Sequence, residues 1–315
     1  MIATIITHPA CHLHKMPAGH PECPERLDAI NNQLLASGID TLLYHRDAPA
    51  ASDEQLLRVH SADYLHSIKQ ALPDKDVVRF ADDLYLSPGS LLAARHAAGA
   101  AILGVDMVMA GETDAVFCNV RPAGHHAEHS SGMGFCLFNN IAVAAAHALE
   151  IYQLDRVAIV DFDVHHGNGT QDIFYNEPRV LFCSSFQHPF YPFTPIDNVP
   201  AHIVNVPLPA SCRSDEFRAG ISERWLPALT RFKPQLIFIS AGFDGHIDDD
   251  MSSMSLVEQD FVWVTKQLRD FVDQSHTGEA SEVCKGIISS LEGGYDLPAL
   301  GRCAMMHIKA LAKLG

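Results

Sequence analysis

The sequence predicts an α/β fold around a central, mostly parallel β-sheet. Short apolar segments rich in β-branched residues alternate with longer helix-like segments along the 315 residues, and this alternation is typical of strand–helix–strand units. Several short segments are apolar at both odd and even positions, which indicates strands that helices cover on both faces. No linker-like segment divides the chain, so we expect a single domain over residues 1–315.

The predicted strands are short and rich in Val, Ile and Phe, as in the segment QLIFISAG at 235–242. Polar residues follow several of them directly, at the end where a parallel sheet usually binds its ligands. The predicted strands cover residues 3–7, 114–120, 156–163, 179–185, 202–208, 235–242 and 285–294.

The predicted helices are longer segments that lie between these strands. The first has Pro88 near its start and Gly111 at its end, which are common start and stop signals of a helix. The second follows Asn139, a residue that can cap it. The predicted helices cover residues 87–111, 139–152, 214–232, 255–272 and 298–314.

The composition argues against a nucleic-acid partner. The formal net charge is −16 at pH 7, and there is no stripe of Lys and Arg side chains that could neutralise phosphates. An acidic surface would suit a cationic substrate, but it is more often a solvated surface that keeps a protein soluble.

We expect a cytoplasmic protein without a membrane partner. The start, MIATIITHPACH, lacks the basic and long apolar regions of a signal peptide. No uninterrupted apolar run approaches the roughly 20 residues that a membrane span needs. The eight cysteines form no CxxC pair, and we interpret them as reduced thiols.

Unusual polar residues gather where four of the predicted strands end. Because the carboxyl ends of parallel strands meet at one edge of a sheet, we expect these loops to converge. Two of them carry adjacent histidines, which are costly to bury unless something binds them. The four loops are RPAGHH (121–126), DFDVHHGNG (161–169), AGFDGH (241–246) and EGGYD (292–296).

Three residues of these loops have the chemistry of a catalytic zinc site. Asp163 and His165 lie two positions apart at a strand end, so their side chains share a face, and Asp244 comes from a neighbouring loop. Two carboxylates and one imidazole around an open position are a typical ligand set for catalytic Zn²⁺. Helix capping or backbone bonding would explain each residue alone, but the three together favour a metal.

The other histidine pair, His125 and His126, can supply an acid and a base. A metal-bound water that attacks a carbonyl needs a base, and the leaving group needs an acid; one histidine can serve as both in turn. Asp161 can hold one imidazole and raise its basicity, whereas Asn168 could hold the other without adding charge. The two histidines should therefore titrate differently.

Tyr295 follows a Gly-Gly pair in the last loop. Its hydroxyl could donate to the oxyanion that forms when a carbonyl is attacked, on the side opposite the metal. The alternative is a tyrosine that only packs after a flexible turn, and GGY alone does not decide between the two.

Together these motifs resemble the signature blocks of the zinc-dependent histone deacetylase family, closest to its class II type and bacterial deacetylase-like relatives. RPAGHHAE, GFCLFNN, DFDVHHGNGTQ, SAGFDGH and LEGGYD carry the resemblance, which runs from residue 19 to residue 295 in the family's order. It implies the arginase/deacetylase fold, with a central eight-stranded, mostly parallel sheet and helices on both faces. It also implies one Zn²⁺ per chain, held by Asp163, His165 and Asp244.

The resemblance implies a role for each catalytic residue by matching position. His126 would be the general base and acid, and His125, oriented by Asp161, would give electrostatic support. Asn168 matches the class II residue at its position, and Tyr295 matches the carbonyl-polarising hydroxyl. The implied reaction is hydrolysis of an amide that Zn²⁺ and Tyr295 polarise, with His126 moving the proton from water to the departing amine.

The resemblance also implies a substrate tunnel. Gly134 and Phe135 match one wall of a narrow acyl-lysine tunnel, and Tyr191 matches the aromatic residue that faces it. Asp83 fits a rim aspartate that binds substrate backbone amides, with Asp82 as the alternative register.

Two further assignments follow from the same resemblance. Arg26 matches an arginine near an internal cavity that is thought to handle released acetate. A structural monovalent cation, usually K⁺, is implied beside the zinc. Its ligand positions correspond to Asp161, Asp163, His165 and Ser184.

One loop departs from the family pattern. In FQHPFYPFTP, Phe186 stands where the family usually has a histidine, and Phe193 and Pro195 stand where it has glycines. We expect this loop by the tunnel mouth, so the departure leaves the preferred acyl chain and partner open.

The substrate class depends mainly on residue 251. Relatives that deacetylate polyamines carry a glutamate seven residues past the zinc aspartate, and Met251 in its place favours acyl-lysine in a peptide or protein. Against this, HPEC at 20–23 resembles a motif that narrows the entrance of the polyamine enzymes, and the charge of −16 would suit a small acylated amine. An acetylpolyamine amidohydrolase is therefore the alternative.

Two other classes are more remote. An arginase-like ureohydrolase shares the fold but needs two Mn²⁺ ions, for which GFDGHID supplies no second aspartate two residues on. A non-catalytic acyl-lysine binder should lack one of the catalytic residues, all of which are present. The oligomeric state and the metal used in the cell, Zn²⁺ or Fe²⁺, stay open.

Overall fold

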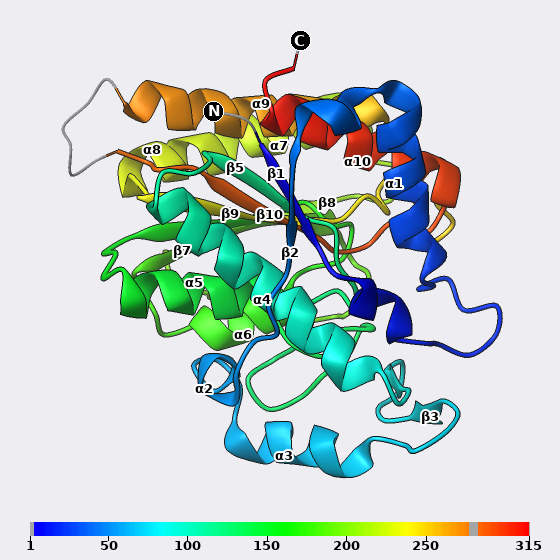
Figure 1. The fold of residues 1–315 in the computed structure, drawn as a ribbon. Helices are drawn as coiled ribbons and strands as arrows, with labels where there is room; N and C mark the ends of the chain where they lie inside the picture. Colours follow the sequence, from blue (N-terminus) through cyan, green and yellow to red (C-terminus); the bar gives the residue numbers. More distant parts are fainter. Residues whose placement is uncertain (1–2, 277–282, 315) are drawn as a thin grey trace.

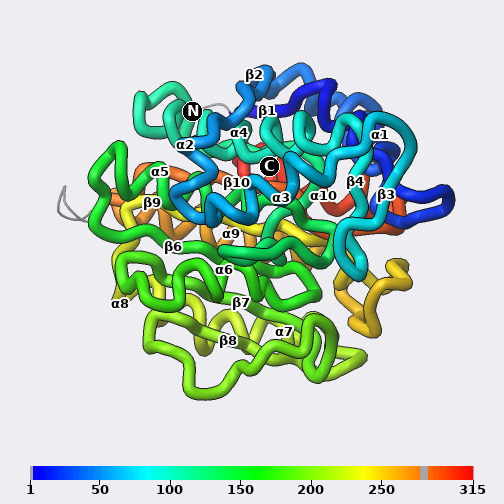
Figure 2. The backbone as a smooth tube through the Cα atoms, turned by 90° about the horizontal axis from the view of Figure 1, so that it is seen from below, coloured from blue at the N-terminus to red at the C-terminus, as the bar shows by residue number. Residues whose placement is uncertain are grey.

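The fold is built on an eight-stranded sheet. The computed structural model describes residues 3–276 and 283–314, and every strand pairing of this sheet within those residues is parallel. The strand order is β2-β1-β5-β10-β9-β6-β7-β8, and Figure 2 shows this succession from β2 at one side of the molecule to β8 at the other. The strands are β1 (Thr4–Thr7), β2 (Tyr44–Asp47), β5 (Ala115–Cys118), β6 (Val157–Asp161), β7 (Val180–Gln187), β8 (Ile203–Leu208), β9 (Leu236–Ala241) and β10 (Ile287–Leu291), with a separate antiparallel hairpin of β3 (Val78–Arg79) and β4 (Tyr85–Leu86).

Helices cover both faces of the sheet (Figure 1). On one face α1 (Glu25–Ser37) and α9 (Glu258–Ser275) both pack against α10 (Leu297–Leu311). On the other face α4 (Ser90–Met109) packs against α5 (Asn140–Ile151). The remaining helical elements are η1 (Pro9–Leu13), η2 (Ile39–Leu42), α2 (Asp53–Leu56), α3 (Ala62–Ala71), α6 (Asn168–Phe174), α7 (Ser214–Gly220), η3 (Ile221–Trp225) and α8 (Leu226–Phe232).

All seven predicted strands are present, but the eighth strand, β2, was not predicted. Its four residues, YHRD, are all exposed, because β2 lies at the edge of the sheet and pairs only with β1. An edge strand with polar side chains lacks the apolar pattern on which a strand prediction depends.

The five predicted helices are also present. The segment predicted as one helix over 214–232 is a continuous helical stretch of α7, η3 and α8, in which the middle turn is a π-helix. Asn139 caps α5, since its side chain accepts a hydrogen bond from the amide of Ala142. Helices α1, α2, α3 and α6 were not predicted. Helix α1 buries only four residues of its thirteen and has a largely polar sequence.

Helix α4 packs in the core. It is the one described helix that is long and apolar enough to cross a membrane, by length and composition only. However, 67% of its most apolar 18-residue segment is buried inside the protein. Gly99 allows close packing, because a Cβ there would lie 1.8 Å from the carbonyl oxygen of Pro49. The apolar character of α4 is therefore used in packing against the sheet and α5.

The sheet register brings polar side chains together at its carboxyl edge. Asp161, the last residue of β6, is the register partner of Ser184 in β7 and of Ser240 in β9. The loops that follow these strands carry the residues singled out from the sequence.

Candidate active site

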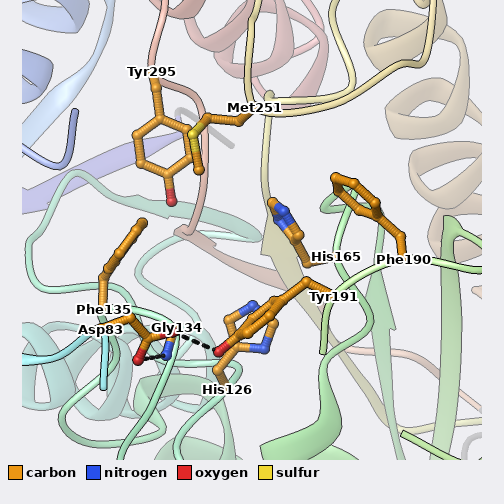
Figure 3. A pocket seen from close by; sticks show the side chains of 9 residues that line it. All are labelled: Asp83, His126, Gly134, Phe135, His165, Phe190, Tyr191, Met251 and Tyr295. Atoms are coloured by element: carbon orange, nitrogen blue, oxygen red, sulfur yellow. Dashed lines mark hydrogen bonds between the residues drawn. The ribbon is translucent and has the colours of Figure 1, made fainter. Parts of the chain in front are cut away.

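The loops at the carboxyl ends of the strands contribute to one pocket, as predicted. The cavity has a volume of about 220 Å³, and Figure 3 shows side chains from separate elements around it. Aromatic and apolar groups form much of the lining, which suits a slender aliphatic chain. The lining residues are Asp83, His126, Gly134, Phe135, His165, Phe190, Tyr191, Met251 and Tyr295.

Asp163, His165 and Asp244 lie together, and His165 reaches the pocket wall. One potential ligand atom from each residue lies within 4.8 Å of the others. Nδ1 of His165 is 3.1 Å from Oδ1 of Asp163 and 3.2 Å from Oδ2 of Asp244. All three side chains are buried, so water cannot offset the charge of the two carboxylates.

This donor set fits a divalent cation. Oδ2 of Asp244 is buried and has no hydrogen-bond partner among the described residues, which is costly for a carboxylate unless a cation approaches it. Glycines leave space for the carboxylates: a Cβ at Gly293 would lie 2.1 Å from this Oδ2, and one at Gly242 would lie 2.0 Å from Oδ2 of Asp163.

The electrostatics of the group also favour a positive charge. Burial lowers the pKa of His165, but Asp163 and Asp244 outweigh it and raise that pKa to about 10. Burial, followed by the charge of Asp163, raises the pKa of Asp244 to about 6. Two buried carboxylates this close together therefore favour a positive charge between them.

His125 is paired with Asp161. Its Nδ1 lies 2.9 Å from Oδ2 of Asp161, and both residues are buried. Burial lowers the pKa of His125, but Asp161 and then Asp163 outweigh it and raise the pKa to about 10. The two carboxylates therefore favour the protonated form of this imidazole.

His126 has a neutral partner instead. Its Nδ1 donates to Oδ1 of Asn168 over 2.7 Å, and Nδ2 of Asn168 donates to Oε1 of Glu128 over 2.8 Å. The second bond orients the amide, so Nε2 of His126 is left free to accept a proton. Burial first, and then the charges of His125 and His165, lower the pKa of His126 well below its ordinary value. The environments of the two histidines thus shift their pKa values in opposite directions.

Tyr295 directs its hydroxyl into the pocket (Figure 3). Its ring meets Phe135 edge-on at a centroid distance of 6.0 Å, and its backbone amide donates to Oδ2 of Asp249 over 2.6 Å. Burial raises the pKa of Tyr295 well above its ordinary value, so the hydroxyl remains a neutral donor.

The rim of the pocket contains Asp83 and not Asp82. Oδ1 of Asp83 accepts from the amide of Gly134 over 3.0 Å, and Oδ2 accepts from the hydroxyl of Tyr191 over 2.7 Å (Figure 3). The side chain of Asp82 is fully exposed and pairs with Arg79. Met251 lines the pocket, as expected from the sequence.

Seven predicted site residues are absent from the pocket lining: Arg26, His125, Asp161, Asp163, Asn168, Ser184 and Asp244. Arg26 contacts Tyr295, with its guanidinium carbon 4.8 Å from the ring centroid, and it is absent from the residues that line the described pocket. Ser184 hydrogen-bonds through its hydroxyl to Nδ1 of His166 over 2.9 Å and is the strand neighbour of Asp161. Its proposed role in binding a monovalent cation stays a prediction.

A second buried group of potential ligands, His125, Cys136 and Glu292, lies close by. The carboxylate of Glu292 already accepts from the amides of Gly124 and His125 and from the hydroxyl of Ser240. This carboxylate therefore has less need of a metal than that of Asp244.

The sequence did not identify several residues that support the site. Glu292 lies within EGGYD, but the motif predicts a role only for Tyr295. Phe190 lies within the loop FQHPFYPFTP, which departs from the family pattern. Three of the remaining four lie within the motifs HPEC and RPAGHHAE, but no local pattern indicates their roles, because their partners are distant in the chain. They are Glu22, Arg121, Glu128 and Asp249.

An eight-stranded parallel sheet, with two carboxylates, an imidazole and a histidine pair at its carboxyl edge, defines an amide-hydrolase architecture. Residues 20–311 match the histone deacetylase domain. The chain belongs to the histone deacetylase family and is a hydrolase of amide bonds.

Relatives and a solved structure agree with this assignment. The chain is 38% identical over 302 residues to a histone deacetylase-like amidohydrolase of Pseudomonas aeruginosa, covering 94% of this chain and 77% of the relative. It is 34% identical over 307 residues to the polyamine deacetylase HDAC10 of Mus musculus, covering 92% of this chain and 44% of that protein. The crystal structure of the HDA15 HD domain superposes with a TM-score of 0.88 at 31% identity, covering 99% of this chain and 90% of that chain.

Proposed function

We propose that the protein is a zinc-dependent deacylase that removes acetyl or other short acyl groups from lysine side chains of peptides or proteins. The observation that carries the proposal is the group of Asp163, His165 and Asp244 next to a pocket that also exposes His126 and Tyr295. A metal, a base and a donor for the oxyanion are the parts that metal-assisted amide hydrolysis requires.

The residues that would hold the zinc are Asp163, His165 and Asp244. Bound Zn²⁺ would act as a Lewis acid toward the carbonyl and lower the pKa of water. The unpartnered Oδ2 of Asp244 supports this assignment. A structural K⁺ near Asp161, Asp163, His165 and Ser184 belongs to the same proposal, as does a single catalytic domain over residues 1–315.

His126 accepts a proton from the attacking water at Nε2 and later delivers it to the departing amine. The hydrogen bond to Asn168 and the lowered pKa keep Nε2 unprotonated before attack. His125, protonated against Asp161, stabilises negative charge without transferring a proton. The hydroxyl of Tyr295 donates to the carbonyl oxygen as its charge develops.

The pocket supports a linear, largely apolar substrate segment. Phe135, Phe190, Tyr191 and Met251 surround it, and these groups suit the methylene chain of lysine better than a second ammonium group. Met251 carries no charge that would select a polyamine.

A small acylated amine is the second candidate substrate. The polyamine deacetylase among the relatives favours it, as does His20 of the HPEC segment, whose ring packs 4.8 Å from that of Phe135 in the tunnel wall. A narrowed entrance would admit a free amine more readily than a protein. A binuclear ureohydrolase is less favoured, because the carboxylate in the neighbouring group, that of Glu292, already accepts three hydrogen bonds from the protein.

The decisive experiment measures kcat/KM for acetyl-lysine peptides of varied acyl length beside N-acetylputrescine and N-acetylspermidine, with zinc content determined on the same preparation. We expect one zinc per chain and preference for acyl-lysine. Preference for the acetylpolyamines would support the second candidate, and no hydrolysis by the zinc-loaded protein would refute both.

A further inference from the structure

We propose that Glu22 is a positioning residue that joins the two catalytic loops through a closed ring of buried hydrogen bonds. The two loops are the His loop, residues 121–127, and the Tyr loop, residues 292–296. The inference rests on the proposed function, because the ring would set the position of His126 relative to Tyr295.

Glu22 binds the start of the His loop. Nε and Nη2 of Arg121 donate to its two carboxylate oxygens over 2.5 Å and 2.6 Å, and Nη2 also donates to its backbone carbonyl over 3.3 Å. Nη1 of Arg121 donates to the carbonyl of Cys11 over 3.1 Å. Arg121 is therefore held at both edges of its guanidinium, four residues before His125.

Glu22 also contacts the arginine that binds the Tyr loop. Nη1 of Arg26, in the first turn of α1, donates over 3.4 Å to Oε1 of Glu22, which lies in the loop before the helix. Nε and Nη2 of Arg26 donate to the carbonyls of Gly294 and Glu292 over 2.6 Å and 2.5 Å. The same guanidinium covers the ring of Tyr295, so it contacts the Tyr loop at three places.

Glu292 closes the ring. Its backbone carbonyl accepts a hydrogen bond from Nη2 of Arg26. Oε2 of its side chain accepts from the amides of Gly124 and His125 over 2.7 Å and 3.1 Å. The path thus runs from Glu292 through Arg26, Glu22 and Arg121 along the His loop and back to Glu292. Every side chain of the ring is completely buried.

The ring connects the two loops beyond the point where the sheet pairing ends. Strands β5 and β10 are neighbours, but their register stops at Cys118 and Ser290, before either catalytic loop begins. Catalysis requires the base and the hydroxyl to face the same carbonyl, and misplacement by about 1 Å can lower the rate about 100-fold.

The chemistry of the ring favours positioning over stability. Buried ion pairs are often no more stabilising than apolar side chains of similar volume, because the charges lose their hydration. Three fully buried charged residues, Glu22, Arg26 and Arg121, are therefore a costly way to fill space. Unlike apolar packing, their directional hydrogen bonds can hold the two loops at one fixed distance.

The test compares four variants of the zinc-loaded protein. Glu22→Gln and Arg121→Met each open the ring. The double variant Glu22→Met/Arg121→Met removes both charges together and lets apolar side chains fill the space. Arg269→Met is the matched control, because Arg269 forms a buried ion pair with Asp114 over 2.8 Å before β5, away from both loops. Each variant is measured for Tm, kcat, KM and hydrogen exchange of peptides from the two loops.

We expect the three ring variants to lose about 10- to 100-fold in kcat with KM changed by less than about threefold. Hydrogen exchange should become faster in both loops together. The double variant should regain Tm relative to Arg121→Met without regaining kcat, and Arg269→Met should lower Tm while leaving kcat and loop exchange unchanged.

Two results would overturn the proposal: wild-type kcat in the double variant, or faster exchange in only one loop of the ring variants. Failure of the proposed function has a different signature. A wild-type protein that hydrolyses none of the amide substrates would refute the deacylase, while the exchange data would still decide whether the ring joins the loops.

Discussion

Nδ1 of His126 donates to Oδ1 of Asn168 over 2.7 Å, a neutral partner in a site otherwise rich in carboxylates. The neighbouring His125 has a carboxylate partner, Asp161, at 2.9 Å. Because of this difference, His125 favours its protonated form and His126 its unprotonated form. Changing the charge of the residue that pairs with His126 tests this.

Asn168→Asp should move the acidic limb of the kcat/KM profile toward higher pH by about 1–3 units. A carboxylate beside His126 favours its protonated form and so raises its pKa, and a base works only when it is unprotonated. Activity should therefore fall on the acidic side of the new pKa. Asn176→Asp, on the exposed surface, adds the same charge elsewhere and should leave the profile unchanged. An unmoved limb in Asn168→Asp would mean that another group is the base.

Asp244→Ala should abolish stoichiometric zinc binding, because it removes the carboxylate whose Oδ2 has no hydrogen-bond partner among the described residues. Metal content after dialysis against a weak chelator checks this. Asp248→Ala is the control from the same loop, since Asp248 is exposed and pairs with Arg302. One zinc per chain retained in Asp244→Ala would contradict the ligand assignment.

Tyr295→Phe should lower kcat by about 10²–10³, the scale for losing one donor to an oxyanion. The ring contacts with Phe135 and Arg26 remain, so Tm should change little. Tyr175→Phe removes an exposed hydroxyl and serves as the control. An unchanged kcat in Tyr295→Phe would remove the hydroxyl from the mechanism.

Met251→Glu should raise kcat/KM for N-acetylspermidine relative to an acetyl-lysine peptide, because it places a carboxylate in the lining where a second ammonium group can pair with it. Met251→Gln has nearly the same shape without the charge and should not shift the ratio. If the two variants behave alike, charge at position 251 does not select the substrate.

Glu22→Gln should be less stable than the wild type at pH 7, and the difference should shrink on acidification. Burial raises the pKa of Glu22, but Arg121 and the other cations outweigh it and lower the pKa to about 2, from an ordinary value of 4.5. The folded-state pKa lies below the unfolded one, so the stabilisation is complete above about pH 4.5 and is lost as the pH falls toward 2. It is on the order of 3 kcal/mol. Denaturant titrations at pH 7 and pH 3 measure it, and a difference that stays constant with pH would contradict the shift.

Sequence patterns were sufficient to predict the buried strands and the loops that follow them. A strand covered on both faces is apolar at nearly every position, as in β9, whose six buried residues include only one polar residue, Ser240. That pattern is local. The edge strand β2 was missed because solvent permits any polar residue there. Asp163, His165 and Asp244 could be predicted as metal ligands for a similar reason. Each follows closely after the end of a strand, so its position can be read from a short stretch of sequence.

The sequence by itself determined the sheet, the edge at which the loops meet and the residue types that gather there, because these depend on polarity along the chain. Only the tertiary structure decided that Asp83 faces the pocket while Asp82 faces solvent, that Glu128 orients Asn168, and that Glu22 joins two catalytic loops. Arg26 and Gly294 are 268 positions apart and yet share a hydrogen bond. Such pairings arise from how the helices and loops pack in space, and packing brings together residues whose separation in the chain carries no periodic signal.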